Sequence, residues 1–281
     1  MSDTEQERIL AKVRETLADV PGIAGLALGG SRARGTADPA SDVDIGLYYH
    51  RANRPGIEQL AAALARIDDN GSTDGYAGYG EWGPWINGGG WLHVNGVKTD
   101  ILLREVDQVS AVVRACAAGQ PEIHYQPGHP HGFCTAIYAG ELRHNIAFHD
   151  PDEVLAALRA LTDPYPEPLA AALIVRFGWE AGFALDTAGT AARRGDVAYV
   201  SGCAYRAVAC LTQVLYASAR RYLLNEKGSI AEAATFATTP AEFRSGVETA
   251  LAALSARPDD LVTALTTLRE IRAEVMASAD R

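Results

Sequence analysis

The residues of this chain that are best suited to chemistry lie between Leu26 and Tyr48. Asp42 and Asp44 alternate with apolar residues, so both carboxylates are predicted to leave the same face of a strand. Ser31 follows two glycines in a turn of small residues, and ten residues separate it from Asp42. Two carboxylates on one strand face, across from a Gly-Ser turn, are suited to holding a hard cation and a phosphorylated ligand.

This spacing resembles the motif of the DNA polymerase β superfamily of nucleotidyltransferases. The likeness is greatest to small bacterial members, such as antibiotic nucleotidyltransferases and the minimal nucleotidyltransferases of toxin–antitoxin pairs. The matching positions are Gly30, Ser31, Arg34, Gly35, Ser41, Asp42 and Asp44. A long spaced match is more specific than a lone glycine motif. The alternative is a hairpin with a polar turn and two surface aspartates.

The resemblance implies a set of metal ligands. Asp42 and Asp44 would share Mg²⁺, with two ions expected, and ATP or another NTP would be the donor. The third carboxylate of the superfamily is matched by Asp100, in the predicted strand Val97–Leu103 beside the strand of the first two. Carboxylates are rare in buried strands, which favours this role for Asp100 over that of a solvent-facing residue at a strand end.

The resemblance also implies nucleotide contacts at Gly30, Ser31, Arg34 and Ser41. Backbone N–H groups of the glycine turn could approach the β- and γ-phosphates, with the Ser31 hydroxyl as a further donor. The Arg34 guanidinium has a geometry that suits phosphate. Lys227 follows a basic helix end and resembles the lysine that related enzymes place over the triphosphate; the alternative is a charge that caps a helix.

Further residues are candidates for supporting roles. Glu81 or Glu180 could act as a general base, although lone acids usually lie at the surface. His124, His129 and His131 lie close together, but they lack the Cys partner or helical spacing of a zinc site, so we expect a loop that contacts substrate. Three tryptophans that could stack on a base or sugar, or pack in the core, are Trp82, Trp85 and Trp91.

Composition limits the class of protein. A chain of 281 residues with 48% hydrophobic residues is long enough for two domains with sizeable cores. The net charge of −10 argues against a polymerase or general RNA-binding enzyme, although a local basic patch could still hold a tRNA end. The four cysteines form no C-x-x-C pair, the N-terminus has no targeting pattern and no run of eighteen apolar residues occurs. We therefore expect a cytoplasmic protein with free thiols and no membrane segment.

The pattern of the chain predicts two domains. Residues 1–150 are expected to form an α/β (α+β) nucleotidyltransferase domain with a mixed, mostly antiparallel sheet, and residues 151–281 an all-α bundle that closes over the cleft. The predicted strands are 23–28, 42–49, 91–94, 97–103 and 141–148. The predicted helices are 4–18, 56–67, 105–118, 152–161, 168–185, 197–223, 240–254 and 259–277. Residues 126–133 are expected to form turns.

The predicted reaction moves NMP, with ATP the expected donor, to a hydroxyl group of a small acceptor. An aminoglycoside-like molecule is one such acceptor, and an acidic protein would suit a cationic one. One alternative is nucleotidylation of a protein or a tRNA, as in toxin–antitoxin relatives. Another is an inactive nucleotide-binding protein, against which the intact Asp42, Asp44 and Asp100 argue. The acceptor, the preferred base and the oligomeric state are left open by the sequence.

Overall fold

The computed structural model describes residues 3–72 and 74–279, so the first two residues of the polar N-terminus lie outside it. The chain forms two compact units. The first, here called the sheet unit, comprises the residues up to Arg114 together with Tyr138–Pro164. The second, the bundle unit, comprises Ala115–Ile137 and the residues from Tyr165 onward. The predicted mixed-sheet domain and helical C-terminal region are confirmed.

The sheet unit is built on a six-stranded sheet among the described residues, in the order β3-β4-β5-β2-β1-β8. Its strands are β1 (Ile23–Leu28), β2 (Val43–Tyr49), β3 (Tyr76–Ala77), β4 (Gly89–Val94), β5 (Val97–Glu105) and β8 (Ile146–His149). Strands β2 and β5 are parallel, and the other neighbours are antiparallel. The sheet is therefore mixed and mostly antiparallel, as the sequence predicted.

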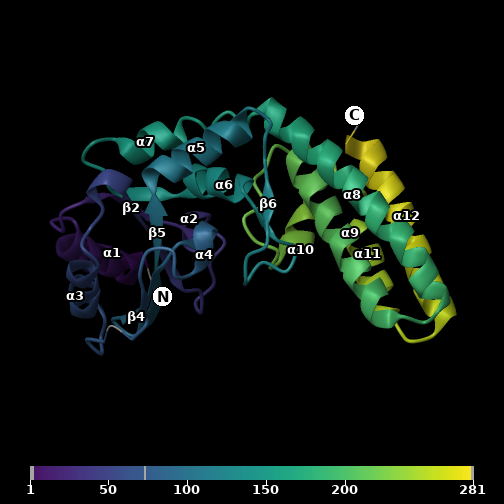
Figure 1. Ribbon diagram of the computed structural model, residues 1–281, viewed down its shortest axis with the longest axis horizontal. Helices are drawn as coiled ribbons and strands as arrows, with labels where there is room; N and C mark the ends of the chain where they lie inside the picture. The colour runs from purple at the N-terminus through teal and green to yellow at the C-terminus, as the bar shows by residue number, and fades with distance from the viewer. Residues whose placement is uncertain (1–2, 73, 280–281) are drawn as a thin grey trace. The chain divides into compact units, whose positions relative to one another are not determined.

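Helices α1 (Asp3–Leu17) and α3 (Ile57–Ile67) lie side by side on the sheet (Figure 1). Their apolar stripes are fully buried in one core with the inward residues of β1, β2 and β5. Short elements complete this unit: α2 (Gly30–Ala33), η1 (Arg51–Asn53), α4 (Gly83–Ile86) and α7 (Val154–Arg159). Helix α5 (Val106–Ala117) follows β5, and the division between the units falls within it.

The predicted strand 141–148 is wrong over most of its length. Residues Ala136–His144 form a helix, α6, and only Ile146–His149 form a strand. Glu141 of this helix accepts two hydrogen bonds of 2.8 Å from the buried Arg104 of β5, in a paired geometry. This bidentate pair holds the helix to the sheet, and no local sequence pattern reveals it.

The bundle unit is formed mainly by four helices that pack on one another (Figure 1). They are α8 (Glu167–Arg193), α9 (Val197–Ser218), α11 (Phe243–Ala252) and α12 (Pro258–Ala279). The short strands β6 (Ile123–His124) and β7 (Phe133–Cys134) pair with each other, and α10 (Ser229–Ala233) follows the long helix α9. Helix α9 has a continuous buried run from Ala207 to Ala217, as its apolar sequence predicts for a core helix.

The compact units differ from the predicted division after residue 150. Leu155 of α7 packs against Gly25 of β1, where a Cβ would lie 3.0 Å from the leucine, so the sheet unit continues to Pro164. Residues 115–137 belong to the bundle unit, where the Pro121 carbonyl accepts a hydrogen bond from Arg176 of α8. Both additions depend on contacts between residues distant in sequence, which composition does not show.

Helix α8 is long and apolar enough to cross a membrane by length and composition, although it contains no unbroken run of eighteen apolar residues. In the structure, 44% of the apolar eighteen-residue stretch of this helix is buried, and the helix packs against α9 and α12. Core helices of helical bundles can have the same length and apolar composition.

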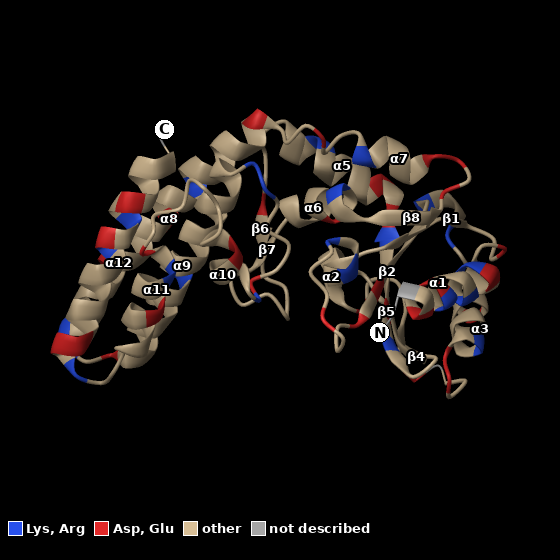
Figure 2. Ribbon diagram, turned by 180° about the vertical axis from the view of Figure 1, so that it is seen from behind, with Lys and Arg blue, Asp and Glu red and all other residues tan. Residues whose placement is uncertain are grey.

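Acidic and basic residues alternate along α1 and α12 instead of forming one basic block (Figure 2). The four cysteines are free thiols, and all but Cys203 are buried.

Candidate active site

The parallel pairing of β2 with β5 brings the predicted carboxylates together. Asp44 and Asp100 are direct register partners on these neighbouring strands. Asp42 lies just before the first residue of β2, and its carboxylate and that of Asp100 contact the same lysine. The structure thus places Asp100 beside the Asp-x-Asp strand, where the sequence predicted it.

Gly30 makes room for one of these carboxylates. It adopts φ +62°, and a Cβ atom there would lie 1.8 Å from Oδ2 of Asp44. The preceding Gly29 donates its backbone N–H to the Asp44 carbonyl over 2.8 Å. Any side chain at position 30 would collide with the carboxylate and strain the backbone, so this glycine is required by both conformation and space.

Lys98 is a residue of this site that the sequence analysis missed. Its Nζ lies 2.5 Å from Oδ2 of Asp42 and 3.5 Å from Oδ2 of Asp100. The signal was present in the sequence, because residues two apart on a strand share a face, as Lys98 and Asp100 do in β5. The hydrogen bond to Asp42 raises the pKa of Lys98, so the ammonium stays charged.

The carboxylates of the site repel one another. Burial, followed by the charges of Asp100 and Asp42, raises the pKa of Asp44 above its ordinary value. Burial also raises the pKa of Asp100, opposed by Lys98. Oδ1 of Asp100 is buried and accepts no hydrogen bond from any described residue. A buried acceptor without a partner, in a cluster of like charges, is a place where a cation would be stabilised.

These residues fit a hard divalent cation in their chemistry, because carboxylate oxygens are the ligands that Mg²⁺ prefers. Across residues 3–72 and 74–279, however, no three His, Cys, Asp or Glu side chains are close enough together to form a ready-made metal site. The ammonium of Lys98 contacts two of the three carboxylates. We conclude that Asp42, Asp44 and Asp100 could hold a cation once their side chains draw together.

The loop before Asp42 is fixed by Arg32, which is not among the matching positions of the motif. Arg32 donates from Nε to the Asp42 carbonyl over 2.9 Å and also hydrogen-bonds the Ser41 carbonyl. The Ser41 hydroxyl is held within the loop, where it accepts a hydrogen bond from the Asp38 backbone over 2.9 Å. Ser31 and the half-buried Arg34 lie in and just after α2. Nucleotide contacts of these residues remain predictions.

The two candidate general bases both have structural contacts. Glu81 accepts a hydrogen bond of 2.9 Å from the Gly78 backbone and so closes its own turn. Glu180, in the bundle unit, pairs with Arg206 over 2.5 Å.

Lys227 is exposed in the turn before α10, with its backbone N–H bound to Oδ1 of Asn225 over 2.8 Å. It therefore lies beyond the end of α9 at Ser218, and its contact with a triphosphate stays a prediction.

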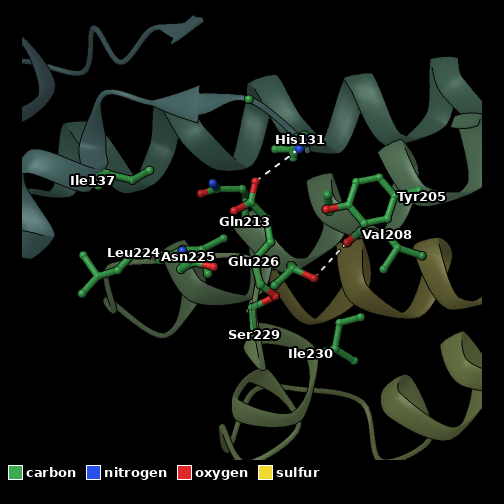
Figure 3. A pocket seen from close by; sticks show the side chains of 14 residues that line it. His131, Ile137, Tyr205, Val208, Gln213, Leu224, Asn225, Glu226, Ser229 and Ile230 are labelled. Carbon is green, nitrogen blue, oxygen red and sulfur yellow. Dashed lines mark hydrogen bonds between the residues drawn. The ribbon is translucent and has the colours of Figure 1, made fainter. Parts of the chain in front are cut away.

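Two residues of the predicted turn segment 126–133, His131 and Gly132, line a small pocket of the bundle unit, about 40 Å³ in volume (Figure 3). His131 is 4% exposed and both of its ring nitrogens lack hydrogen-bond partners among the described residues. The backbone N–H of His131 donates a hydrogen bond to Oε1 of Glu226 over 3.2 Å. The other carboxylate oxygen of Glu226, Oε2, lies 3.3 Å from Nδ1 of His129. His124 instead pairs with Glu122 over 2.8 Å. The three histidines therefore occupy three different surroundings.

Burial lowers the pKa of His131 to about 4, so its ring is neutral at neutral pH. Burial by itself would raise the pKa of the Glu226 carboxyl, but the nearby His129 ring and backbone N–H groups outweigh it and leave this pKa below its ordinary value. Of the tryptophans, Trp82 and Trp91 stack on each other with ring centroids 4.8 Å apart, and Trp91 is 60% exposed. Trp85 packs against Tyr138 instead. Stacking on a ligand remains a prediction for all three.

Comparison with protein families identifies a domain in the part of the chain that carries Asp42 and Asp44. Residues 10–74, which contain Gly30, Ser31, Asp42 and Asp44, match the family model described as the nucleotidyltransferase domain. The chain carries a nucleotidyltransferase domain. The matched segment ends before Asp100, which the pairing of β5 with β2 places beside Asp44. This finding confirms the predicted resemblance and the predicted enzyme class.

A second family model, a domain of unknown function (DUF4037), matches residues 140–227. No curated protein sequence matches the chain. A solved structure of a nucleotidyltransferase-like protein from Exiguobacterium sibiricum 255-15 is similar to it with a TM-score of 0.49 and 10% identity. That alignment covers 98% of this chain and 77% of the other.

Proposed function

We propose that this nucleotidyltransferase moves AMP from ATP to a hydroxyl group of a small molecule, with Mg²⁺ as its cofactor. The observation that carries the proposal is the register pair Asp44–Asp100 on the parallel strands β2 and β5, with Asp42 beside it. In the proposed reaction a bond forms between the acceptor oxygen and the α-phosphorus. The bond to the β-phosphate breaks, pyrophosphate leaves, and the acceptor hydroxyl loses its proton.

The residues have distinct proposed roles. Asp42, Asp44 and Asp100 would hold the metal, which when bound neutralises charge on the phosphates and acidifies the acceptor hydroxyl. Gly30 allows the backbone of the glycine turn to lie against Asp44, so a phosphate bound at Ser31 would be next to the metal ligands. Arg32 orients the loop that carries Asp42. The net charge of −10 favours a cationic acceptor.

Mass spectrometry of products tests the proposal. The purified protein is incubated with ATP, Mg²⁺ and a panel of small hydroxylated amines that includes aminoglycosides, with tRNA and lysate proteins in parallel reactions. We expect pyrophosphate and a small-molecule product heavier by one adenylyl group, that is, by AMP less one water. Asp42→Asn serves as the negative control. Product on tRNA or protein alone would favour the alternative acceptor class, and absence of product from every reaction would contradict transfer. Competition by GTP, CTP and UTP measures the preference for ATP.

A further inference from the structure

Lys98 occupies an unusual position in the candidate site. It projects from β5 on the same face as Asp100, and its ammonium contacts Oδ2 of both Asp42 and Asp100. The lysine side chain is 48% exposed, whereas that of Asp100 is 18% exposed. Its long aliphatic stem therefore runs from the surface to a charge cluster, and can leave that cluster without unfolding the strand.

The charges of the cluster do not balance. With Asp42, Asp44 and Asp100 ionised and Lys98 protonated, three negative charges and one positive charge leave a formal charge of −2. Oδ1 of Asp100 remains without a hydrogen-bond donor among the described residues, although it is buried. One ammonium thus holds the carboxylates near one another but does not neutralise them.

We propose that Lys98 is an internal counter-ion that competes with the divalent cation for the carboxylates of this site. The proposal rests on the metal-dependent transfer proposed above. The ammonium contacts two of the oxygens that would bind the metal, at 2.5 Å from Oδ2 of Asp42 and 3.5 Å from Oδ2 of Asp100. Coordination of Mg²⁺ requires oxygens at about 2.0–2.1 Å, which would place two positive ions next to each other. Lys98 must therefore withdraw as the cation binds, and it lowers the affinity of the site for metal.

Lys98 acts in this scheme as a positioning residue. In the protein without metal it keeps Asp42 and Asp100 from separating under mutual repulsion. Two of the three carboxylates are thereby held near each other in advance, while the weakened affinity makes metal occupancy depend on a second source of negative charge. The triphosphate of the donor nucleotide is such a source, because it supplies further oxygen ligands to the same ion.

Metal binding without nucleotide tests the proposal. The affinity for Mn²⁺ is measured by calorimetry and by electron paramagnetic resonance for the wild type and for Lys98→Met. We expect the variant to bind Mn²⁺ about 10-fold more tightly, because a neighbouring positive charge has been removed. Its melting temperature without metal should fall below that of the wild type, and saturating Mn²⁺ should remove this difference.

Matched variants make the result specific. Lys98→Arg keeps the charge and should not gain affinity. Lys12→Met removes a lysine whose ion pair with Asp69 lies outside the cluster, and should also leave Mn²⁺ affinity unchanged. Lys98→Gln should gain as Lys98→Met does and replaces it if the methionine variant does not fold.

The outcomes separate this proposal from the transfer reaction. Equal or weaker Mn²⁺ binding by the uncharged variants, with the wild type binding normally, would overturn the counter-ion role alone. Absence of Mn²⁺ binding by every form would overturn both the counter-ion role and the metal site. Tighter binding by the uncharged variants would support the counter-ion role, even if no nucleotidylated product is found in the transfer assay.

Discussion

In the sheet unit, Asp44 and Asp100 face each other beside the ammonium of Lys98, whereas in the bundle unit His131 is buried with neither ring nitrogen paired among the described residues. Burial raises the pKa of both aspartates and lowers that of His131. In each case the neutral form is favoured by loss of solvent. The difference is that the aspartates have the Lys98 ammonium nearby to offset their negative charge. His131 has no such counter-charge bound to its ring among the described residues, so burial keeps the ring neutral.

This difference gives the two regions opposite responses to acid. Because the folded pKa of Asp44 is raised, ionisation costs stability at neutral pH, and this cost is relieved as the pH falls through that raised pKa toward the unfolded value of 3.8. His131 costs nothing above its unfolded pKa of 6.5, and destabilises the fold as the pH falls from there toward about 4. The comparison teaches that a cation would stabilise the ionised carboxylates of Asp42, Asp44 and Asp100. The pocket around His131 is most stable at a pH at which the histidine ring is uncharged.

The largest expected effect concerns Asp42 and Asp44. Asp42→Asn or Asp44→Asn should lower turnover by about 1,000-fold, because a metal ligand supplies several kcal/mol of transition-state stabilisation. The fold should persist in both variants, since each removes a repelling charge. Steady-state kinetics and circular dichroism are the measurements. Asp152→Asn, at an exposed position, is the matched control, and near-normal turnover in either site variant would refute the metal assignment.

Asp100→Asn tests whether Asp100 acts in turnover or in binding of the nucleotide. If Asp100 holds only the ion near the acceptor, turnover should fall about 100-fold while the affinity for ATP changes little. The two quantities are obtained from single-turnover kinetics and from equilibrium binding of ATP with Mg²⁺. Equal losses of binding and turnover would instead assign Asp100 to the metal that accompanies the nucleotide, and no loss of either would make it a structural residue.

His131→Leu should remove the acid sensitivity of the bundle unit. Between pH 6.5 and pH 4 the wild type should lose up to about 3 kcal/mol of stability through protonation of this ring, from the pKa of about 4. Hydrogen exchange of the α9 amides at several pH values measures this loss. The exposed His50→Leu is the control and should retain the wild-type profile. An unchanged acid response in His131→Leu would show that another group controls it.

The smallest expected effect is at Lys227, which tests whether the bundle unit contributes to the chemistry of the sheet unit. Lys227→Ala should weaken ATP binding by about 1.5–3 kcal/mol if its ammonium meets the β- or γ-phosphate, and AMP binding should hardly change. Calorimetry with the two nucleotides measures this difference. Equal changes for ATP and AMP would leave Lys227 as a surface charge. The neighbouring Arg221, at an exposed position, offers the control Arg221→Ala.

Several features could be predicted because they depend on neighbours in the sequence. Strand β1 begins and ends where its apolar run does, at Ile23 and Leu28. The turn Asn95-Gly96 joins β4 to β5 with φ values of 54° and 76°, as a tight hairpin requires. The spaced glycine, serine and aspartate motif identified the family through residues that lie close together in the chain.

Other features could not be predicted correctly, and the reasons are physical. The segment 141–148 has few residues and no distinct period, so a helix end and a strand could not be separated, and the buried pair Arg104–Glu141 decides in favour of the helix. Helix α9 was expected to reach Leu223 but ends at Ser218, because Arg220 adopts φ +54°. Tyr222 beyond it is buried against Tyr165, a contact that continues the apolar pattern without continuing the helix.

The sequence by itself indicated which residues are candidates for the chemistry and which strand faces they occupy, since alternation along a strand is a local property. Only the tertiary structure decided that Asp44 is the register partner of Asp100 and that Lys98 lies between Asp42 and Asp100. Register between parallel strands depends on packing across the whole sheet, through residues more than fifty positions apart. The same holds for His131, whose neutrality results from burial against helices that follow it much later in the chain.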